Sequence, residues 1–133
     1  GLEHVTRALT GKVGAFGVAC IAEALAIRGF GLSDQCLIFQ GVYTPDEWEI
    51  ASSYGFEVVL HHRPQLEWLL AKPLAKPVKV WLKINTGMHR LGFSIDDYDQ
   101  VITALKSCPW VDVSIGLMTH FACADEPKHI CHT

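Results

Sequence analysis

The sequence predicts an α/β protein built from parallel strands. Short apolar segments alternate with amphipathic ones along the chain, in the order helix, then strand and helix four times, then strand. Each helix between two strands has to cross back over the sheet, so neighbouring strands run parallel. Half of the 133 residues are hydrophobic and 19% are charged, which is enough to bury a core. Five strands with helical crossovers fit either an open doubly wound sheet or part of a barrel, and periodicity does not separate the two.

The first half of the chain is expected to hold three helices and two strands. The helix that starts near residue 44 has the clearest signals, with Thr44 as N-cap, Pro45 at the first helical position and Glu47 three residues after the cap. Gly55 matches a left-handed C-terminal cap for this helix. The expected helices are 1–10, 20–28 and 44–54, and the expected strands are 13–19 and 35–39.

The second half continues the same alternation. Leu66, Leu69 and Leu70 are expected to face inward from one helix. In the next helix, apolar residues recur at the spacing i, i+3, i+4, i+7 from Tyr98. The expected strands are 56–60, 78–84 and 111–118, and the expected helices are 64–70 and 94–106.

The bulk properties exclude several classes of partner. A net charge of −3 without a basic block argues against nucleic acid and anionic membranes. No apolar run reaches transmembrane length, and no secretory signal is visible, although the N-terminal glycine suggests that the natural start is missing. Irregular cysteine spacing without a CxxC pair predicts free thiols in a reducing compartment, with a cytoplasmic location as the default. The cysteines are Cys20, Cys36, Cys108, Cys123 and Cys131.

Three short patterns resemble binding motifs but favour structural roles. Gly14 and Gly17 do not form a phosphate-binding frame, so close backbone packing is expected there. His61 and His62 are adjacent on an extended chain and point to opposite sides, which makes them a poor pair of metal ligands. One of them could line a cavity, but a solvated or structural role is favoured for both. The His, Cys and His within residues 129–132 lack a fourth ligand, so no metal site is predicted.

Residues 78–93 carry the strongest functional signal. An alternating strand ends abruptly at Asn85-Thr86-Gly87, and two cations, Lys83 and Arg90, lie seven residues apart on either side of this turn. Both are close to the C-terminal end of the strand, where α/β proteins bind ligands. The alternative is an inert strand with a solvated basic loop.

The sequence of this stretch, VKVWLKINTGMHRLGF, resembles the strand-and-loop signature of the alanine racemases. Further segments resemble the same family, including GLEHVTRAL, GAFGVACIAEALAIR, QCLIFQGVYTPDE, FEVVLHHRPQLEWL and GLMTHFACADEP. The resemblance implies that residues 1–133 are a single segment of an alanine-racemase-like (β/α)8 TIM-barrel domain, a partial barrel with about five strands. It also implies pyridoxal 5'-phosphate as cofactor.

The resemblance further implies roles for individual residues. Arg90 matches the arginine that hydrogen-bonds the phenolic oxygen of the cofactor, and His120 matches the histidine that packs against its pyridine ring. Lys83 matches a lysine that is carbamylated in many members and helps to hold that arginine. Asn85 stands where many members have aspartate. Without the resemblance, His120 could instead be a buried histidine bonded to backbone, and the acidic residues at 125–126 favour a polar loop or helix start over an acid–base pair.

The implied function is interconversion of L- and D-alanine by a cytoplasmic homodimer that supplies D-alanine for peptidoglycan. The lysine that the family joins to the cofactor belongs upstream of Gly1, and the tyrosine base belongs to a C-terminal β domain. The isolated chain is therefore expected to be inactive, since a whole barrel needs about 250 residues. One alternative is a pyridoxal-phosphate-binding barrel of cofactor homeostasis without racemase activity. A weaker one is a non-catalytic interaction module with an open sheet.

Overall fold

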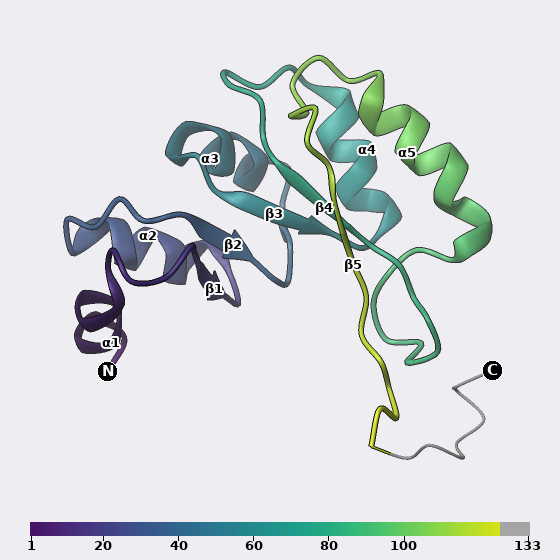
Figure 1. Cartoon of the computed structure of the whole chain (residues 1–133). Helices are drawn as coiled ribbons and strands as arrows, with labels where there is room; N and C mark the ends of the chain where they lie inside the picture. Colours follow the sequence, from purple (N-terminus) through teal and green to yellow (C-terminus); the bar gives the residue numbers. More distant parts are fainter. Residues whose placement is uncertain (126–133) are drawn as a thin grey trace.

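The computed structural model describes residues 1–125, which form one parallel five-stranded sheet with helices between the strands (Figure 1). The strands are β1 (Phe16–Val18), β2 (Cys36–Ile38), β3 (Glu57–Leu60), β4 (Val80–Lys83) and β5 (Gly116–Met118). The helices are α1 (Leu2–Leu9), α2 (Ile21–Gly29), α3 (Asp46–Tyr54), α4 (Arg63–Ala71) and α5 (Tyr98–Lys106), the last preceded by the 3-10 turn η1 (Ile95–Asp97).

The strands lie side by side in the order in which they occur in the chain, β1-β2-β3-β4-β5, and every neighbouring pair is parallel. A doubly wound sheet would reverse direction at a switch point, whereas a barrel adds each strand to the same side of the one before it. The observed order therefore selects the partial barrel from the two architectures that the sequence left open.

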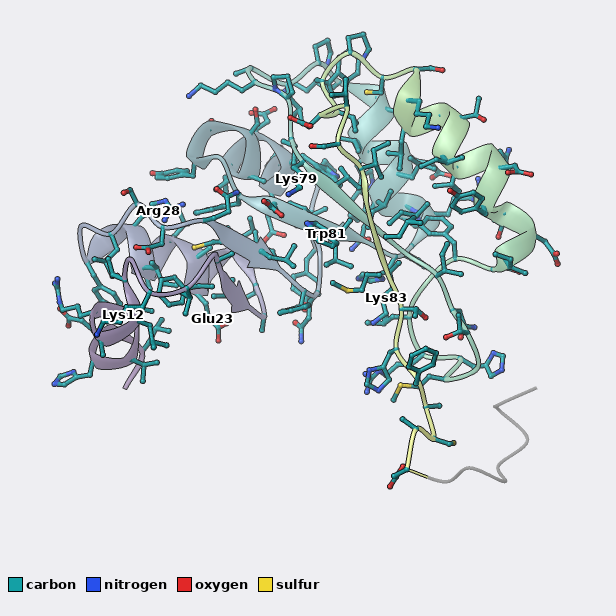
Figure 2. All side chains as sticks on the ribbon, in the orientation of Figure 1. Lys12, Glu23, Arg28, Lys79, Trp81 and Lys83 are labelled. Carbon is teal, nitrogen blue, oxygen red and sulfur yellow. The ribbon has the colours of Figure 1, made fainter. Side chains whose placement is uncertain are left out.

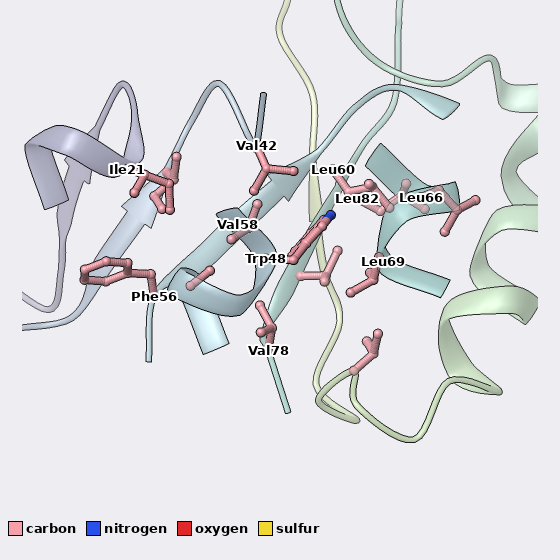
Figure 3. Close-up of a cluster of buried hydrophobic side chains, with 14 of the residues drawn as sticks. Ile21, Val42, Trp48, Phe56, Val58, Leu60, Leu66, Leu69, Val78 and Leu82 are labelled. Atoms are coloured by element: carbon pink, nitrogen blue, oxygen red, sulfur yellow. The ribbon is translucent and has the colours of Figure 1, made fainter. Parts of the chain in front are cut away.

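The main core lies between one face of the sheet and the helices α2–α5. Val58 and Leu60 of β3 and Leu82 of β4 point into this core and have no exposed surface. Trp48 of α3 lies among them (Figure 3), and its indole N–H donates to the carbonyl oxygen of Gln65 at 3.0 Å. Burial of a large aromatic residue whose polar atom is satisfied fixes α3 and α4 against the strands.

The opposite face of the sheet carries polar and charged side chains from β3 and β4. Lys79, Trp81 and Lys83 follow one another on alternate positions along β4 and its approach (Figure 2). Glu57 of β3 accepts from Lys79 Nζ at 3.1 Å and from Trp81 Nε1 at 2.5 Å. Gly116 of β5 lies beneath the same indole ring, where a Cβ atom would come within 2.5 Å of the ring. This face becomes the interior of the barrel.

The expected strand 111–118 is shorter in the structure, where only Gly116–Met118 joins the ladder. Val111 keeps an isolated bridge to Val78, and then Asp112 accepts both the N–H and the hydroxyl of Ser114. This side-chain turn interrupts the strand and leaves Val113 99% exposed. The expected strand 13–19 likewise pairs only over Phe16–Val18.

Two expected helix details are wrong. Thr44 does not cap α3 through its side chain, and the Glu47 carboxylate accepts instead from the N–H of Tyr43 at 2.6 Å. Leu70 is 37% exposed, whereas Gln65, Leu66 and Leu69 form the buried face of α4.

Two predictions about glycines have different outcomes. The left-handed C-terminal cap at Gly55 is confirmed, with φ at +67°. Close packing is confirmed at Gly17, where a Cβ atom would meet the ring of Phe39, but Gly14 has no neighbour within 4 Å.

The cysteines within residues 1–125 carry free thiols: Cys20, Cys36, Cys108 and Cys123. Cys131, Glu126, His129 and His132 lie outside the described residues. Within that described part, no three His, Cys, Asp or Glu side chains gather as a metal site. Among the helices described, none combines the length and apolar character needed to span a membrane.

Candidate active site

The candidate site lies where the C-terminal ends of the parallel strands meet. A hollow of about 580 Å³ opens there, between the loops that leave β2, β3 and β4. Its lining includes two cations, an imidazole and a phenol. The residues are Phe39, Gln40, Tyr43, His61, Lys83, Arg90 and Leu91.

Lys83 and Arg90, which the sequence placed together at a strand end, both line this hollow. Lys83 is the last residue of β4 and is half-buried, while Arg90 lies exposed at the end of the following loop. Within residues 1–125, neither side chain forms an ion pair or a hydrogen bond. Two cations without a carboxylate partner at a concave surface favour an anionic ligand.

The loop that carries Arg90 is built around the side chain of Asn85. Its Oδ1 atom accepts from the N–H of Gly87 at 3.1 Å and from the N–H of His89 at 3.0 Å. Its Nδ2 atom lies 3.0 Å from Nδ1 of His89, which has a positive φ of +53°. One amide side chain therefore satisfies three polar groups and stabilises a backbone conformation that non-glycine residues rarely adopt.

Gly92 closes the same loop against the end of β4. Its φ is +116°, and a Cβ atom there would lie 2.7 Å from the backbone nitrogen of Asn85. Hydrogen bonds from Asn85 N–H to Phe93 O and from Phe93 N–H to Lys83 O, each 2.9 Å, complete the closure. The loop is thus tied at both ends, which limits the positions open to Arg90.

His120 follows β5 and joins the two cations. A narrow crevice with room for about one water molecule is lined by Lys83, Asn85, Arg90 and His120, among others. The loops on its two sides are joined by Thr86, whose hydroxyl lies 2.6 Å from that of Thr119 and donates to His120 O at 3.3 Å. The side chain of His120 is exposed, so the alternative of a buried histidine is wrong. Asp125 lies in the turn that follows.

His61 belongs to the site more closely than the sequence indicated. It is half-buried in the hollow, whereas His62 is exposed. Its Nε2 atom lies 2.8 Å from the carbonyl oxygen of Gln40, and its Nδ1 atom is buried without a partner in the described chain. Burial lowers the pKa of the His61 imidazole, and the charges of His62 and Lys83 lower it further. The hydrogen bond to Gln40 raises the pKa but does not offset these effects.

Three residues of the site were not predicted from the sequence: Gln40 and Tyr43, which line the hollow from the loop after β2, and Gln65, which supports that loop from α4. For the first two residues a signal existed, because they follow a strand end as Lys83 does. Gln65 had none, since a glutamine within a helix is ordinarily exposed.

Comparison with known proteins decides the family. The model of the family described as "Alanine racemase, N-terminal domain" matches residues 1–133. The chain belongs to this family. It is 57% identical over 127 residues to the alanine racemase of Legionella pneumophila strain Corby, covering 96% of this chain and 36% of that protein.

Solved alanine racemase structures share the fold. The biosynthetic alanine racemase of Pseudomonas aeruginosa superposes with a TM-score of 0.90 at 36% identity, over 98% of this chain and 36% of that one. The alanine racemase of Acinetobacter baumannii gives a TM-score of 0.80 at 39% identity, over 94% of this chain and 35% of that one. The chain thus spans about a third of the length of these alanine racemases, and the partial barrel is the N-terminal segment that they share.

Proposed function

We propose that this chain forms one wall of the active site of a pyridoxal-phosphate-dependent alanine racemase. The observation that carries the proposal is that Lys83 and Arg90, which have no partner within residues 1–125, line one hollow at the strand ends of a family member. The relatives reported above bear the racemase name, which favours this function over a cofactor-binding barrel without activity. Alanine as substrate, a homodimer, a cytoplasmic location and a role in peptidoglycan supply belong to the same proposal.

The residues present fit the cofactor. Pyridoxal phosphate is a flat pyridine ring with an anionic phosphate group, and the hollow of about 580 Å³ lies within the range of small-molecule sites. The guanidinium of Arg90 supplies positive charge, and His120 offers an aromatic face in the adjoining crevice. Among residues 1–125, those that line the hollow include no Asp or Glu, so no described carboxylate there opposes an anion.

Each residue then has a distinct task. Arg90 would donate a hydrogen bond to the phenolic oxygen of the cofactor, and His120 would pack against its ring. The Lys83 amine adds to carbon dioxide, forming an N–C bond and releasing a proton, and the resulting carbamate accepts from Arg90 in a charge-assisted pair. When bound, pyridoxal phosphate supplies the electron sink that stabilises negative charge at the substrate Cα.

The proton-transferring lysine and tyrosine are proposed to lie outside residues 1–133. The isolated chain is accordingly proposed to be inactive. Within the described residues, β1 and β5 each pair on one side only, which leaves two open sheet edges. A racemase assay on the isolated chain tests this point, and turnover of alanine by it would contradict the proposal.

The decisive experiment uses the complete gene product that contains this chain. Alanine racemisation and pyridoxal phosphate affinity are measured for the wild type and for Arg90→Ala, with Arg7→Ala on the exposed face of α1 as a matched control. Loss of one charge-assisted hydrogen bond predicts cofactor binding weaker by about tenfold to a hundredfold in Arg90→Ala. The control should match the wild type.

The outcomes separate the alternatives. Cofactor binding without racemisation of any amino acid would favour the homeostasis protein instead. Unchanged affinity in Arg90→Ala would remove Arg90 from the site. For the carbamate, labelled carbon dioxide should give a carbamate resonance that disappears in Lys83→Gln and persists in Lys72→Gln, because Lys72 is exposed and is not among the residues that line the hollow.

A further inference from the structure

His61 is the residue at which two walls of the hollow meet. Its ring Nε2 lies 2.8 Å from the carbonyl oxygen of Gln40, at the start of the loop that carries Tyr43. Its own carbonyl oxygen accepts from the N–H of Gly92 at 3.2 Å, at the end of the loop that carries Arg90. A single residue at the end of β3 therefore connects the loops that follow β2 and β4.

The side chain of Gln65 completes this junction from α4. It is only 4% exposed, and its Oε1 atom accepts from the N–H of His61 at 3.1 Å. Its Nε2 atom donates to Val42 O at 3.0 Å and to Gln40 O at 3.4 Å. At Gly41, where φ is +69°, a Cβ atom would lie 2.6 Å from the carbonyl oxygen of Val59. The loop after β2 is thus held without room for adjustment.

These contacts assign the imidazole tautomer. The amide of Gln65 has a fixed orientation, because its oxygen meets an N–H and its nitrogen meets two carbonyl oxygens. Its nitrogen lies 3.2 Å from His61 Nε2, but its hydrogens already point to backbone acceptors. The Gln40 carbonyl can only accept, so His61 Nε2 carries the proton and Nδ1 is the bare nitrogen.

We infer that His61 is a positioning residue. As the neutral Nε2–H tautomer it connects the loop that carries Gln40 to the loop that carries Arg90, and it thereby sets the width of the hollow for its ligand. The inference rests on the proposed function in one respect, since the ligand is taken to be pyridoxal phosphate. His61 itself is assigned no proton transfer, because its buried Nδ1 has no partner within residues 1–125.

The surroundings of the ring keep it neutral. An imidazolium would bury an Nδ1–H group without an acceptor, which is costly. Groups that oppose a second proton on the ring when they are positively charged lie on its own loop, on β4 and on the loop beyond β4, and a phenol lies on the loop after β2. These groups are His62, Lys83, Arg90 and Tyr43.

The test compares two substitutions in the complete gene product. In His61→Gln, the amide nitrogen can reach the place of Nε2 and keep the bond to Gln40, whereas the shorter side chain in His61→Asn cannot. Pyridoxal phosphate should bind to His61→Gln within about twofold of the wild type and to His61→Asn about tenfold more weakly, the range expected for one hydrogen bond. His62→Asn, at the exposed neighbouring position, serves as the control and should bind normally.

A second readout does not depend on the cofactor or on the folding of a variant. Ring nitrogen chemical shifts of wild-type His61 should show a protonated Nε2 and an unprotonated Nδ1. The opposite tautomer, or equal affinities in His61→Gln and His61→Asn, would overturn the inference. If the wild type fails to bind pyridoxal phosphate, the proposed function fails. The chemical shifts alone then decide whether His61 forms the proposed hydrogen bond to Gln40.

Discussion

Trp81 donates its indole N–H to the carboxylate of Glu57 at 2.5 Å, across the pair of strands β3 and β4. Glu57 is 9% exposed, and its second oxygen accepts from Lys79 at 3.1 Å. This buried carboxylate therefore joins two donors on the face of the sheet that lines the barrel interior.

Replacement of Glu57 by leucine should lower the free energy of unfolding by about 1–3 kcal/mol, because the Trp81 N–H loses its partner. Glu57→Gln keeps an acceptor for Trp81 and loses only the contact with the partly exposed Lys79, so its cost should be about 1 kcal/mol or less. Urea denaturation of the complete gene product measures both. Equal stability of Glu57→Leu and the wild type would show that the indole finds another acceptor.

Gly92→Ala should destabilise the loop that carries Arg90. The added Cβ atom meets backbone atoms of Ile84 and Asn85 at 2.9 and 2.7 Å, and φ is +116°. We expect a loss of about 1–3 kcal/mol in unfolding free energy together with weaker cofactor binding. Gly14→Ala is the matched control, because it has no neighbour within 4 Å. Equal effects of the two substitutions would mean that the loop adapts freely.

Asn85→Ala removes the acceptor for two loop N–H groups and should weaken pyridoxal phosphate binding by about tenfold. Asn85→Asp retains both acceptor positions but adds a negative charge to the crevice shared with Lys83 and Arg90. Its affinity should therefore fall between those of the wild type and Asn85→Ala. Isothermal titration of the three proteins checks this order, and an Asn85→Ala protein with wild-type affinity would contradict it.

The neutral His61 makes stability depend on pH. Its pKa lies below the ordinary value of 6.5 because the ring is buried, so below pH 6.5 the unfolded chain binds more protons than the folded one. This contribution to stability is present above pH 6.5 and is lost as the pH falls through the lowered pKa. The unfolding free energy should therefore fall as the pH is lowered below 6.5. This fall should be smaller in His61→Gln than in the wild type. An unchanged slope would assign the effect to other groups.

The alternation of helices and strands was predictable because it depends on local apolar periodicity, and every expected element has a counterpart in the structure. The order of the strands in the sheet was not predictable, because pairing between strands is a non-local property. The last strand was overestimated for a similar reason: its apolar pattern continues through Val113, but Asp112 turns the backbone away from the ladder.

The candidate site divides in the same way. Lys83 and Arg90 could be placed together because they flank one turn at a strand end, and they do line one hollow. The role of His61 was hidden because its ring contact with Gln40 spans 21 residues and Gln65 reaches Gln40 over 25. No periodic pattern reports contacts of that kind. The resemblance supplied His120, whose distance from Arg90 along the chain gives no local signal.

The chain-order arrangement of the strands also bears on how the domain is made. Each described strand pairs only with the strand before it and the one after it. Every new strand can therefore dock on a surface already formed, one β-α unit at a time, as the polypeptide leaves the ribosome from its N-terminus. In such vectorial assembly, the edge at β5 is the growing end of the sheet.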